Sequence, residues 1–175
     1  MKIKKGHKRI VIFFKNFVIK IAIIHFISAI KNTIYLVNRG IFWRMFIRFN
    51  YRYSASIRGN LFAGPMENLN ERLLFKKTKS SLLVPTYFSF LGIVNVQKRV
   101  KSLNINSFEF RSQMCKLTND EAYADKHHFF FSENFSKSEE GYLQMIDYGN
   151  YKCNNVIIKY GEKIQKEFDF SFKRK

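Results

Sequence analysis

The first 66 residues of the chain contain no Asp or Glu, and the first carboxylate is Glu67. Thirteen Lys and Arg side chains occupy this stretch, followed by nine basic and three acidic residues in 67–117 and nine basic and ten acidic residues in 118–175. The formal net charge of +18 therefore belongs to the first two segments. A folded protein this basic favours a polyanionic partner, which is RNA, DNA or an acidic lipid surface.

The composition restricts the class of protein further. A length of 175 residues gives one domain, or one domain with long extensions. A hydrophobic content of 46% with 20 Phe excludes a disordered basic tail. The two cysteines, Cys115 and Cys153, cannot build a disulfide framework, and the pair His127-His128 has no ligand-like spacing to either of them. We therefore expect a reducing compartment, no metal site and no cofactor.

Residues 10–39 are predicted to form a helix, because polar residues recur at intervals that leave a wide apolar face. Arg39 followed by Gly40 is a typical helix end. Lys20 and Lys31 interrupt the apolar run, so no stretch reaches the roughly 18–20 residues that a membrane span needs. An interfacial amphipathic helix is the membrane alternative. The acid-free start also resembles an organellar import signal, although the retained arm is the favoured interpretation.

Residues 41–54 place three arginines at helical spacing. Arg44, Arg48 and Arg52 follow one another at every fourth position and would form one guanidinium stripe on a helix. A guanidinium donates two parallel hydrogen bonds to a phosphate, and no carboxylate lies nearby in the sequence to compete. The spacing predicts a phosphate-binding stripe but does not separate RNA phosphates from lipid headgroups.

The central segment, residues 58–117, contains both prolines of the chain. Pro65 is predicted to open a helix that ends in the lysines near residue 77. A short apolar strand is expected at 81–84, followed by two strands at 90–96 and 100–105. The turn between them is predicted at Gln97-Lys98, so the hairpin would carry the positive charges of Lys98, Arg99 and Lys101.

This segment resembles the small-subunit ribosomal protein S-nineteen family. Four pieces agree with the family pattern in order and spacing, including Gly64-Pro65 and Val84-Pro85; they are residues 58–66, 73–76, 78–85 and 87–117. The sequence departs from the pattern where the family's Gly-His-Lys becomes Arg111-Ser112-Gln113, and where its Asn-Gly turn becomes Val96-Gln97. The resemblance covers about a third of the chain.

The resemblance implies a small domain with a short antiparallel sheet in the head of the small ribosomal subunit. It implies binding to small-subunit rRNA, contact with ribosomal protein S-thirteen and a position near the bridge to the large subunit. The rRNA-binding residues then expected are Arg58, Lys76, Lys77, Lys79, Ser81, Lys98, Arg99, Lys101, Arg111 and Gln113, in addition to the arginine stripe. Such side chains neutralise phosphates and recognise folded RNA mainly by shape.

Residues 118–175 have no counterpart in that family. The alternation of apolar and polar residues at 155–172 predicts a β-hairpin with a turn at Gly161. The adjacent histidines at 127–128 are interpreted as ordinary loop residues. We expect this near-neutral extension to dock on neighbouring proteins or RNA.

Together these patterns predict an α+β protein in three segments: a basic helical extension at 1–57, an rRNA-binding core at 58–117 and a hairpin-containing extension at 118–175. No nucleophile–base pair, phosphate-binding glycine loop or metal motif is present, so an enzyme is not expected. Phe, Ile, Lys, Asn and Tyr, whose codons are AT-rich, dominate the composition. This indicates an AT-rich genome, for which parasite nuclei, endosymbionts and organelles are candidates. From this and the family resemblance, we expect an organellar, mitochondrial ribosome, with an organelle-encoded gene as one source. The rival hypothesis is an accessory subunit of an organellar inner-membrane complex.

Overall fold

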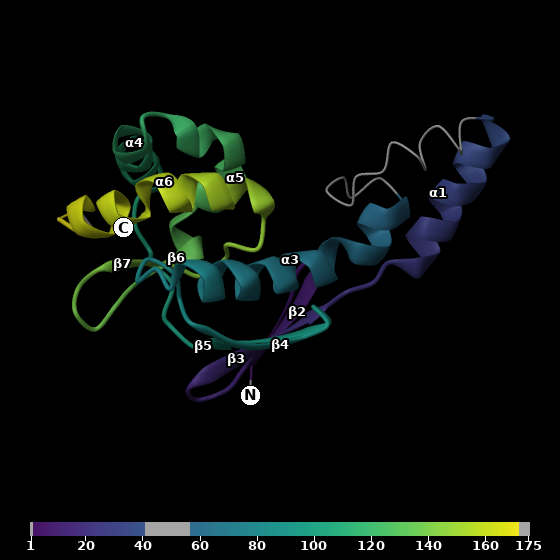
Figure 1. Ribbon diagram of the computed structural model, residues 1–175, viewed down its shortest axis with the longest axis horizontal. Coiled ribbons are helices and arrows are strands. Elements are labelled where there is room, and N and C mark those ends of the chain that lie inside the picture. Colours follow the sequence, from purple (N-terminus) through teal and green to yellow (C-terminus); the bar gives the residue numbers. More distant parts are fainter. Residues whose placement is uncertain (1, 41–56, 172–175) are drawn as a thin grey trace.

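The computed structural model describes residues 2–40 and 57–171, with side chains in the second part from Leu61 onward (Figure 1). A five-stranded antiparallel sheet forms one layer, and the long helix α3 (Ile57–Thr78) lies across it. A second group of helices lies on the other side of α3, and helix α1 (Phe26–Asn38) projects away from the sheet. The predicted α+β class with a small antiparallel sheet is confirmed.

The first three strands of the sheet come from the N-terminal segment. They are β1 (Lys2–Lys5), β2 (Arg9–Phe13) and β3 (Phe17–Ala22), and the complete strand order is β1-β2-β3-β5-β4. The predicted helix over 10–39 is therefore wrong for its first half and is confirmed only over 26–38. In β3 the buried residues alternate, with Val18, Lys20 and Ala22 facing inward. In the predicted helix Lys20 would lie on the polar face, whereas in strand β3 its side chain is buried and faces inward.

The other two strands, β4 (Thr86–Phe90) and β5 (Val94–Lys98), form a hairpin beside β3. Its turn lies at residues 91–92, where Leu91 and Gly92 both have positive φ, as a tight hairpin turn requires. The turn predicted at Gln97-Lys98 is wrong. Residues 81–84 and 100–105 form only isolated bridges, from Leu83 to Met145 and from Ser102 to Ser136, instead of the predicted strands.

Helix α3 begins eight residues before Pro65, so the prediction that this proline opens the helix is wrong. Two glycines let the helix approach the sheet closely. A Cβ on Gly64 would lie 2.7 Å from the carbonyl oxygen of Lys8, and a Cβ on Gly92 would lie 2.1 Å from the carbonyl oxygen of Pro65. The Gly-Pro pair thus marks a backbone contact between α3, β2 and the β4–β5 turn.

The C-terminal part contains α4 (Ser107–Thr118), the 3₁₀ turn η1 (Glu121–Asp125), α5 (Lys126–Phe129), the 3₁₀ turn η2 (Ser132–Asn134), the small hairpin β6 (Phe135–Lys137) and β7 (Leu143–Met145), and α6 (Tyr151–Glu167). These elements enclose the main hydrophobic core. Its fully buried side chains include Phe110, Met114, Phe129, Phe135, Leu143, Met145 and Ile164.

The hairpin predicted over 155–172 is wrong, because α6 occupies most of that range. Cys153, Ile157, Tyr160 and Ile164 are buried on one face of the helix, at spacings of three and four residues. Asn150 caps the helix by accepting a hydrogen bond from the backbone N–H of Lys152. The division of the chain at 57/58 and 117/118 stays a prediction.

A buried group of charges joins the N-terminal strands to α3. Glu71 of α3 has no exposed side-chain area and accepts hydrogen bonds from Arg9 of β2 at 2.6 Å and from Lys20 of β3 at 2.9 Å. Asn95 of β5 donates to the same carboxylate at 2.9 Å. Arg9 also pairs with Asp147 at 2.5 Å. Two cations of the acid-free segment, Arg9 and Lys20, are thus neutralised by carboxylates from later in the chain.

This group is expected to dominate the stability of the sheet. Replacing Glu71 by Gln leaves the buried Lys20 without its ion-pair partner and Arg9 with Asp147 and Glu67 only, and breaking a buried pair from one side costs about 3–5 kcal/mol. Chemical denaturation should show this loss in the free energy of unfolding. The control is Glu139→Gln, whose exposed carboxylate lies 3.9 Å from Lys98 and should contribute almost nothing. Equal effects of the two substitutions would contradict the role of Glu71.

Candidate functional site

The predicted basic residues fall into three groups according to what the structure describes. Arg44, Arg48 and Arg52 lie outside the described residues. Arg58 is in the first turn of α3, and its side chain also lies outside them. The other predicted residues are on the described part of the chain and can be placed individually.

Three of the lysines lie where α3 ends. Lys76, Lys77 and Lys79 are exposed, and within the described residues none of them makes an ion pair. Lys79 has a positive φ of 47° and turns the chain out of the helix. Ser81 follows this turn, and its hydroxyl donates to Oε1 of Gln165 in α6 at 2.5 Å. The lysines are therefore presented to solvent on a rigid helix end.

The basic residues after β5 are partly engaged in the structure. Lys98 ends β5 and is 3.9 Å from Glu139, whereas Arg99 donates to the carbonyl oxygen of Phe14 at 2.6 Å. Lys101 is exposed and makes no ion pair within the described residues. Because the turn is at 91–92, these side chains lie at the end of the sheet next to the C-terminus of α3 instead of on a hairpin tip (Figure 1).

The remaining predicted residues belong to α4. The Arg111 guanidinium lies 4.8 Å above the ring of Phe130 and donates to the hydroxyl of Tyr123 at 3.0 Å. Gln113 is half-buried, and its carbonyl oxygen is enclosed without a hydrogen-bond partner. Arg111 thus has an exposed cation stacked on aromatic rings, which holds its guanidinium in place.

A groove of about 490 Å³ separates the N-terminal strands from the loop that carries Asp147. Its walls contain five cationic side chains, Lys4, Lys8, Arg9, Lys20 and Lys98. Three carboxylates, Glu67, Glu133 and Asp147, also line it. Sequence analysis did not predict this groove, because it depends on strands β1–β3 where a helix was expected.

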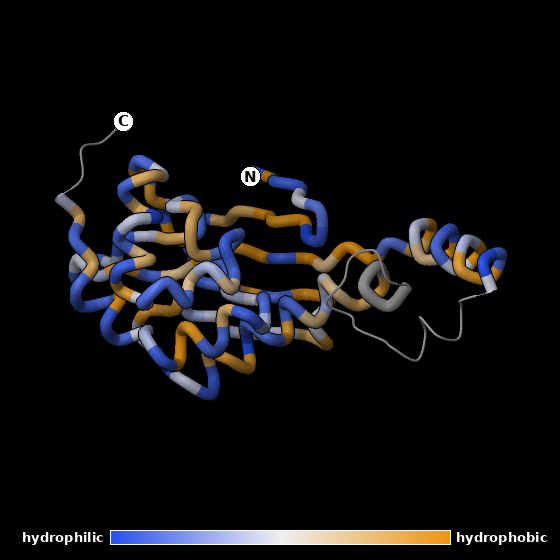
Figure 2. Tube along the Cα trace, turned by 90° about the horizontal axis from the view of Figure 1, so that it is seen from above, coloured by the Kyte–Doolittle hydropathy of each residue, from blue (hydrophilic) through white to orange (hydrophobic). Residues whose placement is uncertain are grey.

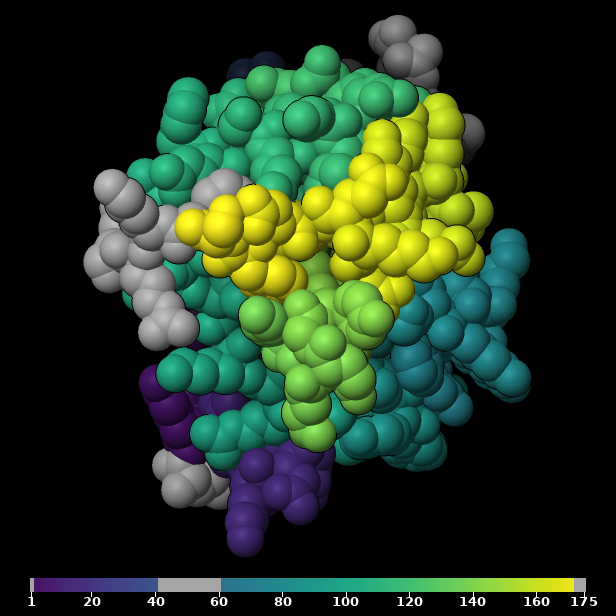
Figure 3. Space-filling model, turned by 90° about the vertical axis from the view of Figure 1, so that its left-hand side faces the viewer, coloured from purple at the N-terminus to yellow at the C-terminus, as the bar shows by residue number. Residues whose placement is uncertain are grey.

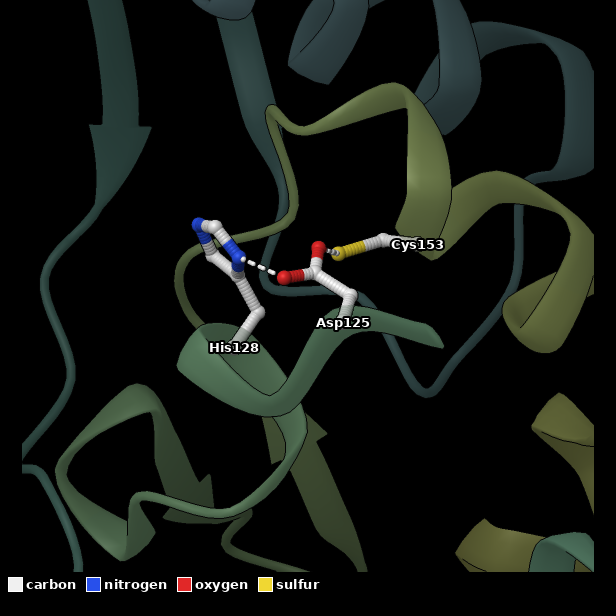
Figure 4. A group of neighbouring side chains, drawn as sticks. All are labelled: Asp125, His128 and Cys153. Carbon is white, nitrogen blue, oxygen red and sulfur yellow. Dashed lines mark hydrogen bonds and ion pairs between the residues drawn. The ribbon is translucent and has the colours of Figure 1, made fainter. Parts of the chain in front are cut away.

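A second group of side chains includes His128, which also lines this groove. Asp125 ends η1, His128 is in α5 and Cys153 is in the first turn of α6 (Figure 4). Nδ1 of His128 is 2.8 Å from Oδ1 of Asp125, and the thiol of Cys153 donates to Oδ2 of the same carboxylate at 3.1 Å. Their potential ligand atoms all lie within 4.8 Å of one another. The trio was missed in the sequence because only Asp125 and His128 are near neighbours in it.

The surroundings of the trio shift its ionisation. Burial raises the pKa of the Cys153 thiol well above its ordinary value, and the negative charge of Asp125 raises it further. Burial alone would lower the pKa of His128, but its hydrogen bond to Asp125 and the charge of Asp147 outweigh this and raise it. In this environment the neutral form of the Cys153 thiol and the protonated form of the His128 imidazole are both favoured more than in the free side chains.

Comparison with known proteins identified no matching family model, curated protein or solved structure. Among the described helices, none combines the length and apolar character needed to cross a membrane.

The charges around Asp147 predict how stability depends on pH. Burial would raise the pKa of this carboxyl, but Arg9, Lys20 and His128 outweigh it and hold the pKa well below its usual value. Because the folded-state pKa is depressed, Asp147 contributes stability that is present above about pH 4 and is lost as the pH falls below the unfolded-state pKa. Unfolding measured between pH 6 and pH 2 should show this loss.

The substitution Asp147→Asn should flatten that acid-induced loss while lowering stability at neutral pH. The control is Asp120→Asn, an exposed turn residue with positive φ that Asn also tolerates. It should retain the acid sensitivity of the wild type. An unchanged pH profile in Asp147→Asn would refute the assignment.

Proposed function

We propose that this chain is a structural, non-catalytic constituent of the small ribosomal subunit that binds rRNA through exposed basic side chains. The supporting observation is where its charge resides. The buried ion pairs combine Lys8, Arg9 and Lys20 with Glu67, Glu71 and Asp147, so three cations cancel three carboxylates. The whole net charge of +18 therefore remains outside this group and requires neutralisation by a partner.

The exposed members of the predicted set lie on one side of the molecule. The C-terminal end of α3, the segment after β5 and helix α4 are all on the left-hand side of Figure 1. Figure 3 views this side, with the β6–β7 hairpin between the end of α3 and the segment after β5. Exposed lysines on rigid elements suit the phosphates of a folded RNA, which is recognised by shape and backbone.

The resemblance to the S-nineteen family supports the same proposal. Its motif residues Lys76, Lys79 and Ser81 are at the end of α3, and Arg111 is on α4 on the same side of the molecule. On this proposal the neighbours in the subunit head include a protein of the S-thirteen family and bridge elements of the large subunit. The composition is rich in residues with AT-rich codons, and on this basis the ribosome that we propose is that of the mitochondrial matrix.

A membrane-associated subunit is the second candidate, and helix α1 is the observation that favours it. Phe26, Ile27, Ile30 and Ile34 are each more than half exposed on this helix. The helix projects from the body of the molecule (Figure 2). An apolar helix flanked by Lys31 and Arg39 suits a lipid interface as well as a protein groove.

RNA binding can be tested at the end of α3. Combined substitution of Lys76, Lys77 and Lys79 by Gln should weaken binding of the full-length protein to a small-subunit rRNA head fragment. If each lysine contacts one phosphate, the slope of log affinity against log salt should fall by about two units, since each contact contributes roughly 0.7–0.9. Filter binding or fluorescence anisotropy over a salt series measures both quantities.

The matched control removes the same charge away from that end, by substituting the exposed Lys31 of helix α1, Arg39 at the end of that helix and Lys152 at the start of α6 with Gln. It should leave the salt slope nearly unchanged. Equal loss in both variants would indicate non-specific charge attraction. Binding to anionic vesicles but not to RNA would favour the membrane candidate.

A further inference from the structure

We propose that Asp125, His128 and Cys153 form a binding site for a divalent metal ion of the zinc class. The three side chains approach from two separate parts of the chain and direct their heteroatoms toward one another (Figure 4). In a tetrahedral zinc site, bond lengths of about 2.0–2.3 Å place ligand atoms roughly 3.3–3.7 Å apart. The observed separations of 2.8 and 3.1 Å run to the two different oxygens of Asp125, and the three ligand atoms all lie within 4.8 Å of one another, so side-chain adjustments of about 1 Å would bring them to this spacing.

The donor types select the metal. One sulfur, one imidazole nitrogen and one carboxylate oxygen form a mixed set that suits zinc and similar borderline ions. Magnesium and calcium prefer oxygen ligands throughout, so the thiol of Cys153 disfavours them. Three protein ligands leave one coordination position for solvent.

The three ligands are held rigidly and are largely enclosed. Cys153 is fully buried and Asp125 is 4% exposed. The first turn of α6 fixes Cys153 through the Asn150 cap, and α5 follows Asp125 directly. A cluster whose backbone is fixed in this way binds a metal with little loss of conformational entropy.

The outer nitrogen of His128 has a support of the kind found around metal-bound histidines. Nε2 lies 4.0 Å from Oδ2 of Asp147, and Asp147 is held in turn by Arg9. A carboxylate on the non-ligating nitrogen orients the ring and increases its basicity. Both His128 and Asp147 line the basic groove, which gives an ion a route from solvent to the trio.

The exchange of protons for metal balances the buried charge. On binding, the S–H bond of Cys153 breaks and a metal–sulfur bond forms, and the proton passes to the solvent. A proton on His128 leaves in the same way when Nδ1 becomes a ligand. When both protons leave, one divalent ion replaces their two positive charges and the buried charge is unchanged. Because binding releases protons, it strengthens as the pH rises.

The test uses the purified full-length protein, freed of metal and titrated with Zn²⁺ and, separately, with Co²⁺. We expect one equivalent of metal and, with Co²⁺, a sulfur-to-cobalt charge-transfer band with the visible spectrum of a tetrahedral site. Cys153→Ser should abolish that band and weaken Zn²⁺ binding by about 100-fold or more, since even outer supporting residues contribute 10–100-fold. Serine still donates to Asp125, so circular dichroism should show a retained fold.

The chain supplies matched controls for both ligands. Cys115→Ser changes the other free cysteine, which is half-buried outside the trio, and His127→Gln changes the exposed neighbour of His128. Both should bind metal like the wild type, whereas His128→Gln should not. If Cys153→Ser fails to fold, the metal affinities of His128→Gln and His127→Gln and the cobalt spectrum of the wild type still test the proposed site. A wild type without stoichiometric zinc, or a cobalt spectrum unaffected by Cys153→Ser, would overturn the proposal.

Discussion

The buried carboxylate of Glu71 is the interaction on which the arrangement of the molecule depends. It accepts hydrogen bonds from Arg9 of β2, Lys20 of β3 and Asn95 of β5, so one side chain of α3 joins three strands of the sheet. A cation buried at that depth without a partner would be strongly unfavourable. The first acids after the long basic segment, Glu67 and Glu71, therefore neutralise that segment and hold it against α3.

This constraint separates the charges that build the fold from those left for a partner. Arg9 and Lys20 are structural, and Asp147 extends their network to the loop before α6. The exposed lysines at the end of α3 are not needed for any ion pair among the described residues. At the opposite end of the molecule, α1 exposes an apolar face (Figure 2). The two ends therefore offer different chemistry, one suited to a polyanion and the other to an apolar surface.

Sequence patterns predicted the α+β class, helix α1 and its end at Gly40, because those signals are local. They failed where one pattern fitted two structures. Lys20 fits the polar face of a helix and also an inward position of a strand, and only Glu71 decides between them. Ile164 and Phe168 are spaced by four, which satisfies both the alternation of a strand and the face of a helix. Pro65 was predicted at a helix start because proline is favoured in the first turn, whereas it lies inside α3.

The candidate sites also differ in whether the sequence alone could predict them. The lysines near residue 77 could be predicted from composition alone, because exposed charge is visible in the sequence. The trio could not, since Cys153 is 28 residues from Asp125 and reaches it only when α6 packs beside η1. The basic groove also escaped prediction, because its walls are strands from the segment assigned to a helix.

Fractionation of an organelle lysate tests the ribosomal proposal most directly, by following the full-length protein through a sucrose gradient with and without nuclease, high salt and detergent. The proposal predicts that the protein sediments with the small ribosomal subunit, that nuclease or high salt releases it, and that detergent does not. Sedimentation with membranes, with release by detergent alone and no protein in the subunit fraction, would contradict it.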